Sequence, residues 1–228
     1  MEVQEAVKRI ILQRGLAAGD PLPTESELMA ELGIGRNSVR EALKVLQAVG
    51  IVDIRHGFGM FVGQMSLNGL VDELAFHSRM TMASAASEER HHLGHLIEIR
   101  EVLESGLVIR LIEQGIGAAH LVPALGAIEE MAKEAQVGDV SPETDRLFHD
   151  VLYRPLANPL VSQLLSAFWE VYHQLRDDLG APDETAADVV RKHRDIYAAV
   201  IAGDKEAAVT AMRAHFDGVR SRLARLGS

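Results

Sequence analysis

Cysteine is absent from the 228-residue sequence, so the chain has neither a disulfide framework nor a thiolate metal site. Aromatic residues make up only 4% of it, and a composition poor in aromatics but rich in Ala, Leu and Glu favours helices over sheets. No apolar run approaches the roughly 20 residues that cross a membrane, and the N-terminus MEVQEAVKRI lacks a signal-peptide core. We therefore expect a helix-rich cytoplasmic protein with no membrane partner.

The net charge of −10 is unevenly distributed. Residues 1–63 hold 7 Lys and Arg against 8 Asp and Glu, which leaves −1 there and −9 in the rest of the chain. A near-neutral segment binds phosphates only if its few cations share one face. The overall charge therefore gives no support to DNA binding, and such a function has to be argued from pattern.

The first fifty residues carry the pattern of three helices. Apolar residues recur at helical spacing across residues 3–14. Thr24 and Glu27 have the spacing of a capping box, which begins a second helix that reaches Leu32. A third helix is predicted over residues 36–49. Its inner, apolar stripe consists of Val39, Ala42, Leu43, Leu46 and Val49.

A β-hairpin is predicted directly after these helices. Gly50 ends the third helix, and the short apolar runs 51–54 and 60–62 are strand candidates on either side of the glycine-bearing tip 55–59. Three helices followed by a hairpin form a winged helix-turn-helix.

Beyond the hairpin the pattern changes to long helices. They are predicted at 67–81, 91–116, 119–137, 142–154, 158–179, 184–202 and 204–226, with loops at 82–89, 137–142 and 180–183. We therefore predict a mainly α protein with two domains. Residues 1–65 form a winged helix-turn-helix for DNA binding, and residues 66–228 form an all-helical bundle for effector binding and dimerisation.

The third helix carries side chains suited to reading base edges. Arg pairs with guanine and Asn with adenine in the major groove, and these contacts come from the N-terminal turns of a recognition helix. Arg36, Asn37 and Arg40 share one outward face, and Lys44 extends that cationic stripe by one turn. Two solvated arginines on any helix surface would give the same sequence pattern. The prediction of DNA binding therefore also depends on the neighbouring hairpin.

The tip of the hairpin offers Arg55 and His56, and Gly57 and Gly59 allow its backbone to approach DNA closely. Together with the third helix, these residues predict a double-stranded DNA-binding surface.

At this point the run LPTESELMAELGIGRNSVREALKVLQAVGIVDIRHGFGMFV resembles the winged helix-turn-helix of GntR-type bacterial regulators. The matching residues are Leu22-Pro23, Glu25, Leu28, Arg36, Val39-Arg40-Glu41-Ala42-Leu43, Leu46, Gly50 and Gly59. The resemblance implies that Arg36, Asn37, Arg40 and the pair His56-Gly57 touch DNA. Ser26 and Gly35 depart from the Arg and the Ser or Thr that the family often has, so we expect modest affinity from each DNA-binding head.

In the second domain, one carboxylate and three imidazoles stand apart by their spacing. Asp145 and His149 are four residues apart and leave one helix face together. His193 and His215 lie ten and twelve residues from Gly203, roughly 15–18 Å along a helix, so an antiparallel hairpin would place them at one depth. The four would suit Zn²⁺, or Ni²⁺, Mn²⁺ or Fe²⁺ with added water. Asp–His pairs are also common without metal, so spacing leaves both interpretations open.

The helical part also resembles the FCD effector domain of FadR-type members of the family. The matching pieces are Ile99-Arg100-Glu101-Val102-Leu103-Glu104, Asp145, Phe148-His149, Asn158-Pro159, His193, Ile196, Ala199, Ile201, Gly203-Asp204, Ala211-Met212 and His215. In metal-containing members these motif positions bind a divalent cation, and all four ligands are present here. The resemblance thus implies a metal site.

An open coordination position on such a metal suits a small carboxylate or hydroxy acid. Arg100 is a candidate second anchor because guanidinium pairs with a carboxylate bidentately. An internal salt bridge from Arg100 to Glu104 is the equally weighted alternative.

These features predict a homodimeric, metabolite-sensing regulator that reads a pseudo-palindromic operator, rather than an enzyme. Because Asp and His sites also support hydrolytic or oxygenase chemistry, a metal-dependent enzyme fused to a DNA-binding domain is the alternative. A third interpretation keeps the helical domain as a dimerisation module alone.

Overall fold

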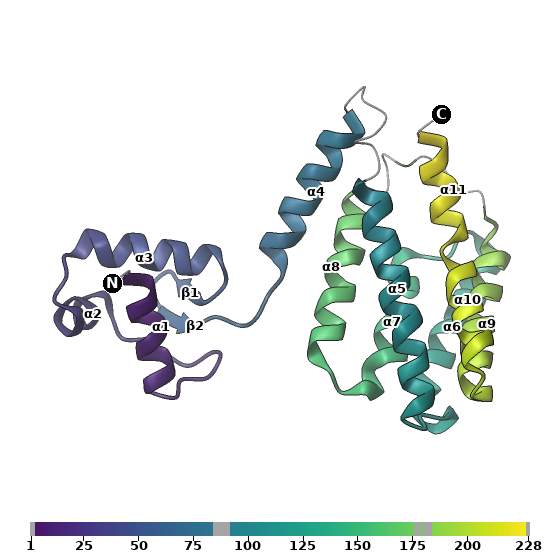
Figure 1. Ribbon diagram of the computed structural model, residues 1–228, viewed down its shortest axis with the longest axis horizontal. Coiled ribbons are helices and arrows are strands. Elements are labelled where there is room, and N and C mark those ends of the chain that lie inside the picture. The colour runs from purple at the N-terminus through teal and green to yellow at the C-terminus, as the bar shows by residue number, and fades with distance from the viewer. Residues whose placement is uncertain (1–2, 84–91, 176–178, 180–183, 227–228) are drawn as a thin grey trace. The chain divides into compact units, whose positions relative to one another are not determined.

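A computed structural model describes residues 3–83, 92–175, 179 and 184–226. The chain divides into two compact units, residues 1–69 and residues 70–228. Both are built mainly from helices, as predicted (Figure 1). None of the described helices is long and apolar enough to cross a membrane.

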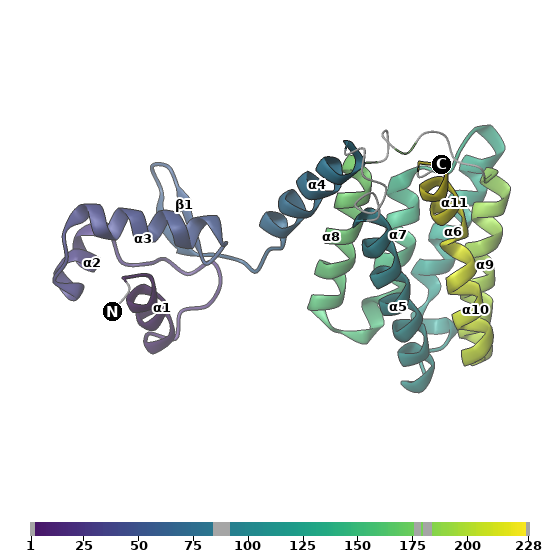
Figure 2. The same cartoon turned by 45° about the horizontal axis from the view of Figure 1, so that its top comes forward.

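The first unit has the predicted order of elements. It contains α1 (Val3–Gln13), α2 (Glu25–Leu32), α3 (Arg36–Ala48), β1 (Val52–Arg55) and β2 (Gly59–Val62). The strands pair antiparallel, with Val52 opposite Val62 and Arg55 opposite Gly59. This small hairpin follows α3 and projects beside it (Figure 2). The winged helix-turn-helix fold is therefore confirmed.

Local signals explain where the helices of this unit begin and end. The capping box at α2 is present: Thr24 Oγ1 accepts a 3.3 Å hydrogen bond from the Glu27 amide, and the Thr24 amide donates to Glu27 Oε2 at 2.7 Å. Gly33 ends α2 in the left-handed region with a φ of 66°. Gly35 is the N-cap of α3 and makes no side-chain capping bond.

The apolar faces of these elements form one small core. Its buried members are Val7, Ile10, Ile11, Leu22, Leu28, Val39, Leu43, Leu46 and Val52. One predicted member is wrong: Val49 is 61% exposed. It lies one residue beyond the last residue of α3, as the C-cap, so the helical spacing no longer directs its side chain inward.

The second unit is all-helical among its described residues. It consists of α4 (Asn68–Ala83), α5 (His92–Glu113), η1 (Ala118–His120), α6 (Val122–Val137), α7 (Pro142–Tyr153), η2 (Arg154–Leu156), α8 (Pro159–Leu175), α9 (Ala186–Ala202), α10 (Lys205–His215) and α11 (Asp217–Leu226). Met82 and Ala83, predicted as the start of a loop, belong to α4 instead, and residues 84–91 and 180–183 lie outside the described part of the chain.

The last predicted helix, 204–226, is divided at Phe216. This residue is the C-cap of α10 and its side chain is buried. The chain resumes as α11 at Asp217.

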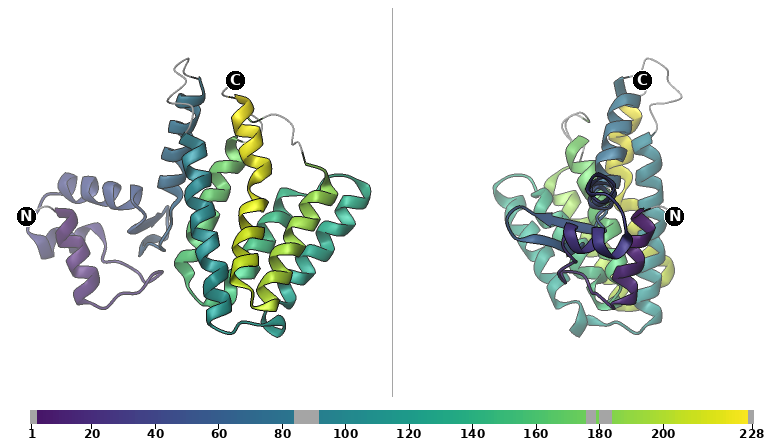
Figure 3. Two further views of the ribbon diagram at one scale, coloured as in Figure 1. Left: turned by 45° about the vertical axis from the view of Figure 1, so that its right-hand side comes forward. Right: turned by 90° about the vertical axis from the view of Figure 1, so that its left-hand side faces the viewer.

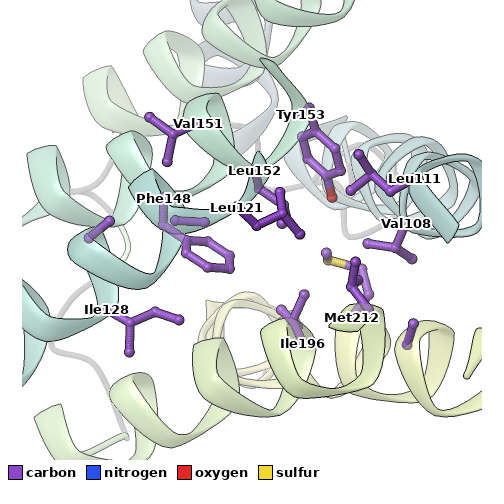
Figure 4. Close-up of a cluster of buried hydrophobic side chains, with 14 of the residues drawn as sticks. Val108, Leu111, Leu121, Ile128, Phe148, Val151, Leu152, Tyr153, Ile196 and Met212 are labelled. Atoms are coloured by element: carbon purple, nitrogen blue, oxygen red, sulfur yellow. The ribbon is translucent and has the colours of Figure 1, made fainter. Parts of the chain in front are cut away.

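The core of this unit is drawn from helices far apart in sequence. Phe148 and Leu152 on α7, Ile196 on α9 and Met212 on α10 are buried in it together with Val108 on α5 (Figure 4). The helices α9 and α10 run side by side, with α6 next to α9 (Figures 1 and 3). Side chains of α7 reach α9 through this core, and the ring centroids of Phe148 and His193 lie 4.7 Å apart.

Candidate metal centre and nucleic-acid interface

The four predicted metal ligands meet in the second unit. Asp145 and His149 come from α7, His193 from α9 and His215 from α10, and one ligand atom of each lies within 4.8 Å of the others. The ring centroids of His193 and His215 are 4.7 Å apart, and those of His149 and His215 are 4.9 Å apart. The equal-depth placement predicted for His193 and His215 is therefore present.

Local sequence places these ligands in register. Ser141 caps α7 by accepting a 3.2 Å hydrogen bond from the Thr144 amide. Gly203 ends α9 in the left-handed region with a φ of 72°, and Asp204 caps α10 at once by accepting from the Ala207 amide at 2.9 Å. A turn this short makes α9 and α10 a hairpin, which aligns His193 with His215.

The Nδ1 atoms of two of these histidines are already engaged. His149 Nδ1 lies 2.5 Å from Glu104 Oε2, and His193 Nδ1 lies 2.7 Å from the carbonyl oxygen of Val189. Since a carboxylate and a carbonyl only accept hydrogen bonds, each Nδ1 is the protonated donor. In the neutral rings, the Nε2 atoms therefore carry the lone pairs.

Those Nε2 atoms are buried and make no hydrogen bond with the described residues. His193 Nε2 also lies 2.9 Å from Asp145 Oδ1, so two electron-rich atoms face each other when the ring is neutral. Buried polar atoms without a partner are costly. A divalent cation would satisfy both nitrogens and the carboxylate, and a carboxylate with three imidazoles is a donor set that Zn²⁺ accepts. The residues therefore fit a metal ion.

A buried hydrogen-bond network around Glu104 holds the Nδ1 side of the His149 ring. Glu104 is fully buried, and its other oxygen, Oε1, accepts a 2.6 Å hydrogen bond from Arg100 Nε. The Tyr153 hydroxyl donates to Glu104 Oε2 at 3.1 Å. Carboxylates that hold the second nitrogen of a ligand histidine orient its ring and raise its basicity.

Sequence reasoning placed Glu104 in the run that resembles the FCD domain and gave it as a partner of Arg100, and that salt bridge is present. It missed the contact with His149, which joins residues 45 positions apart. The four-residue spacing of Arg100 and Glu104 was the only available signal.

Burial and charge set the protonation of this cluster. Burial alone would raise the pKa of Glu104, but the charges of His149 and Arg100 outweigh it and lower the pKa. Burial would raise the pKa of Asp145 as well, but its 2.9 Å contact and charge interaction with His193 lower it. Burial, with charge on His193 and His149, lowers the pKa of His215 well below 6.5. Both carboxylates are thus ionised and His215 is neutral, the states that bind a metal.

The cluster opens into a cavity of about 660 Å³. Asp145, His215 and Arg100 lie on its wall, and the side chain of Asp145 keeps 27% of its surface exposed. Its other charged lining residues are Asp139, Glu184, Lys192 and Arg222. A ligand in this space could reach both the cluster and Arg100.

In the first unit, the predicted DNA-reading residues of α3 all face solvent. Arg36, Asn37 and Arg40 are exposed, as is Lys44 one turn on. Arg40 Nε lies 2.9 Å from an oxygen of Glu25. Such exposed pairs contribute only about 0–1 kcal/mol, so Arg40 can exchange this partner for DNA at little cost.

Lys44 and the wing residue Arg55 also form ion pairs with neighbouring carboxylates. Lys44 Nζ pairs with Glu41 at 2.9 Å, and Arg55 Nε pairs with Asp53 at 2.8 Å. Arg55 also lies over the Phe61 ring, 4.4 Å from its centroid, which holds it against the strand. Lys44 on α3 and Arg55 on the wing are therefore both already engaged with neighbouring residues.

The wing tip itself is exposed. His56 and Gly57 form it, and Gly57 has a φ of 79°, a conformation that favours glycine. Sequence reasoning missed Phe58, which is 83% exposed at the same tip.

Comparison with protein families matches both units. Residues 1–62 match the model of bacterial regulatory proteins of the gntR family, and residues 95–218 match the FCD domain. The second match spans more than half of the chain.

Similar proteins carry names of the same kind. The chain is 28% identical to the HTH-type transcriptional regulator LutR of Bacillus subtilis, over 91% of this chain and 93% of LutR. It is 27% identical to the HTH-type transcriptional repressor NanR of Citrobacter rodentium, over 99% of this chain and 85% of that protein. It is 24% identical to a putative L-lactate dehydrogenase operon regulatory protein of Escherichia coli, over 98% and 86% of the two chains.

Among solved structures, a GntR protein of Streptococcus agalactiae aligns with a TM-score of 0.67 and 24% identity, over 96% of this chain and 97% of that one. This likeness concerns the fold. The winged helix-turn-helix, the helical second unit and both family matches agree, and the chain belongs to the GntR family of bacterial regulatory proteins, as a transcriptional regulator with a C-terminal FCD domain.

Proposed function

We propose that this regulator binds its operator under the control of a small carboxylate or hydroxy acid held at a divalent metal site. The observation that carries the proposal is the cluster of Asp145, His149, His193 and His215, with buried ring nitrogens directed at one another beside a cavity. When bound, the metal supplies a Lewis-acidic position for an effector oxygen. We take Zn²⁺ as the first candidate, with Ni²⁺, Mn²⁺ or Fe²⁺ as alternatives.

The cavity supports an anionic effector of modest size. Arg100 lies on its wall, although Glu104 neutralises much of its charge, so we assign Arg100 a secondary anchoring role. The name of the relative from Escherichia coli refers to an L-lactate dehydrogenase operon, and L-lactate is a hydroxy acid. The relatives are named as regulators, which favours a binding role for the cavity over an enzymatic one.

For DNA, we propose that Arg36, Asn37 and Arg40 read base edges in the major groove while Lys44 contacts phosphate. Arg55, His56 and Gly57 then contact the backbone from the wing. Because each head offers few cations, stable binding requires two heads on a pseudo-palindromic site, which a homodimer in the cytoplasm would supply.

The test is the zinc content of purified protein after saturation with Zn²⁺ and dialysis, with native mass spectrometry of the same samples. We expect about one zinc ion per chain in the wild type and near-complete loss in His193→Ala, because a fully buried ligand is removed. His120→Ala is the matched control, since His120 is exposed on η1 and outside the cluster. Equal zinc content in His193→Ala and the wild type would overturn the metal site.

A further inference from the structure

Lys192 is a buried cation on the cavity wall, next in sequence to His193. Its side chain is 9% exposed, and its ammonium group pairs with the carboxylate of Glu184. Glu184 precedes α9, and 23% of its side chain remains exposed. A buried ammonium needs an anionic partner, and the partner here is a side chain at the edge of the cavity.

The Glu184 carboxylate lies where a side chain at residue 218 would otherwise be, and this residue is Gly218. A Cβ built on Gly218 would lie 2.5 Å from both Cδ and Oε2 of Glu184. Gly218 is the second residue of α11, so a side chain at this position would have to displace the Glu184 carboxylate. Three segments, around Glu184, α9 and α11, thus accommodate one carboxylate beside Lys192.

A second cation lies one helical turn further along α11. Arg222 follows Gly218 by four residues and so shares its face. It is buried, lines the same cavity, and its Nη1 donates a 2.8 Å hydrogen bond to the Tyr172 hydroxyl. Lys192 and Arg222 are thus both buried cations that line this cavity.

Two of the other charged groups on this wall already have partners, and a third, Asp139, is exposed. Arg100 is bound to Glu104, and Asp145 belongs to the metal cluster. Glu184 differs because it lies outside any helix, so its partly exposed carboxylate can move away without disturbing a packed element.

We propose that Lys192 is an anion subsite for a second acidic group of the effector, and that Glu184 fills this subsite until the effector displaces it. The inference rests on the proposed function, in which the first acidic group is anchored at the metal. Exchanging one carboxylate for another keeps the buried ammonium paired throughout. The preferred effector is then a dianion, such as a hydroxy acid with two carboxylates.

Two probes that differ by one carboxylate test the subsite. L-lactate and L-malate share the 2-hydroxy acid group, and malate adds a second carboxylate. Their affinities for zinc-loaded protein are measured by titration calorimetry in the wild type, Lys192→Met and Glu184→Gln. A hydrogen bond to a charged group contributes about 1.5–3 kcal/mol. We therefore expect Lys192→Met to weaken malate binding by at least about ten-fold and to leave lactate binding unchanged.

Glu184→Gln removes the internal competitor, so it should tighten malate binding by about ten-fold with little effect on lactate. Gly218→Ala should act in the same direction, because the added methyl group displaces the Glu184 carboxylate without removing its charge. The double variant Glu184→Gln/Lys192→Met should behave as Lys192→Met. Malate-dependent increases in melting temperature give a second readout for any variant that folds less stably.

An unchanged malate-to-lactate ratio in Lys192→Met would overturn the subsite, and so would the absence of malate binding to both the wild type and Glu184→Gln. His193→Ala separates this result from the proposed function. If His193→Ala abolishes binding of both acids while Lys192→Met changes nothing, the metal-anchored effector stands and the subsite fails. If Lys192→Met weakens malate binding while His193→Ala changes neither acid, the subsite stands and the metal anchor fails.

Discussion

The charged residues at the two candidate sites are used in opposite ways. In the first unit, Arg40 and Glu25 form an exposed pair at 2.9 Å, and other surface cations are engaged similarly. In the second unit, Arg100 and Glu104 form a pair at 2.6 Å that is almost fully buried and continues to His149. Arginine and glutamate thus form an exchangeable surface pair in the first unit. In the second unit they form a buried pair that holds His149 in position.

The difference follows from the solvent around each pair. Water screens an exposed pair, so its partners exchange easily for phosphates or base edges. A buried pair has lost its hydration, and removing one partner leaves a charge that nothing compensates. Paired changes of Glu to Gln in the two units therefore test the contrast directly.

The largest effect is expected from Glu104→Gln. The variant leaves Arg100 buried without its counter-charge, which should lower the free energy of unfolding by about 3–5 kcal/mol. It also weakens the support of His149, so zinc affinity should fall by about 10–100-fold. Urea unfolding and competition with a zinc chelator measure the two effects. A loss of stability below 1 kcal/mol would mean that the buried network is no more important than a surface pair.

The next largest effect is expected from Arg40→Ala. A base-contacting arginine contributes roughly 1–3 kcal/mol, so operator affinity should fall by about 5–150-fold, with relaxed preference at the contacted base. Fluorescence anisotropy with operator and scrambled duplexes measures this change. Lys133→Ala, which removes an exposed cation from α6, is the control and should bind as the wild type does. Equal binding by Arg40→Ala would contradict the assigned base contact.

A smaller effect is expected from Glu25→Gln. Glu25 competes with DNA for Arg40, and the exposed pair that the two residues form contributes at most about 1 kcal/mol. Operator affinity should therefore rise by no more than about five-fold, and the gain should shrink at high salt. The same anisotropy assay at two salt concentrations checks it. A decrease in affinity would show that Glu25 positions Arg40 rather than competing for it.

The smallest effect is expected from Gly35→Ser at the N-cap of α3. The backbone there is extended, and an added Cβ meets nothing within 4 Å. Serine should stabilise the helix by a few tenths of a kcal/mol. Gly33→Ala is the contrasting variant, because its φ of 66° costs a residue with a side chain about 1–2 kcal/mol. Thermal unfolding followed by circular dichroism compares them, and a destabilised Gly35→Ser would refute the capping argument.

Local signals were enough to predict most of the helices. The capping box of Thr24 and Glu27, and Gly203 at the turn between α9 and α10, each act within a few residues. The errors occur where local pattern stops controlling the side chain. Val49 follows the stripe of α3 but lies past its end, and Phe216 interrupts a long helical pattern with its side chain buried in the core.

By itself, the sequence determined the winged helix-turn-helix and the depth at which His193 and His215 meet, because helical rise and a short turn convert spacing into position. Only the tertiary structure decided that Glu104 holds His149 and that Glu184 occupies the space beside Gly218 at Lys192. These contacts join segments that are far apart in sequence or belong to different elements, and the packing of the second unit brings them together. Their geometry depends on how whole elements pack, which residue spacing along one chain does not encode.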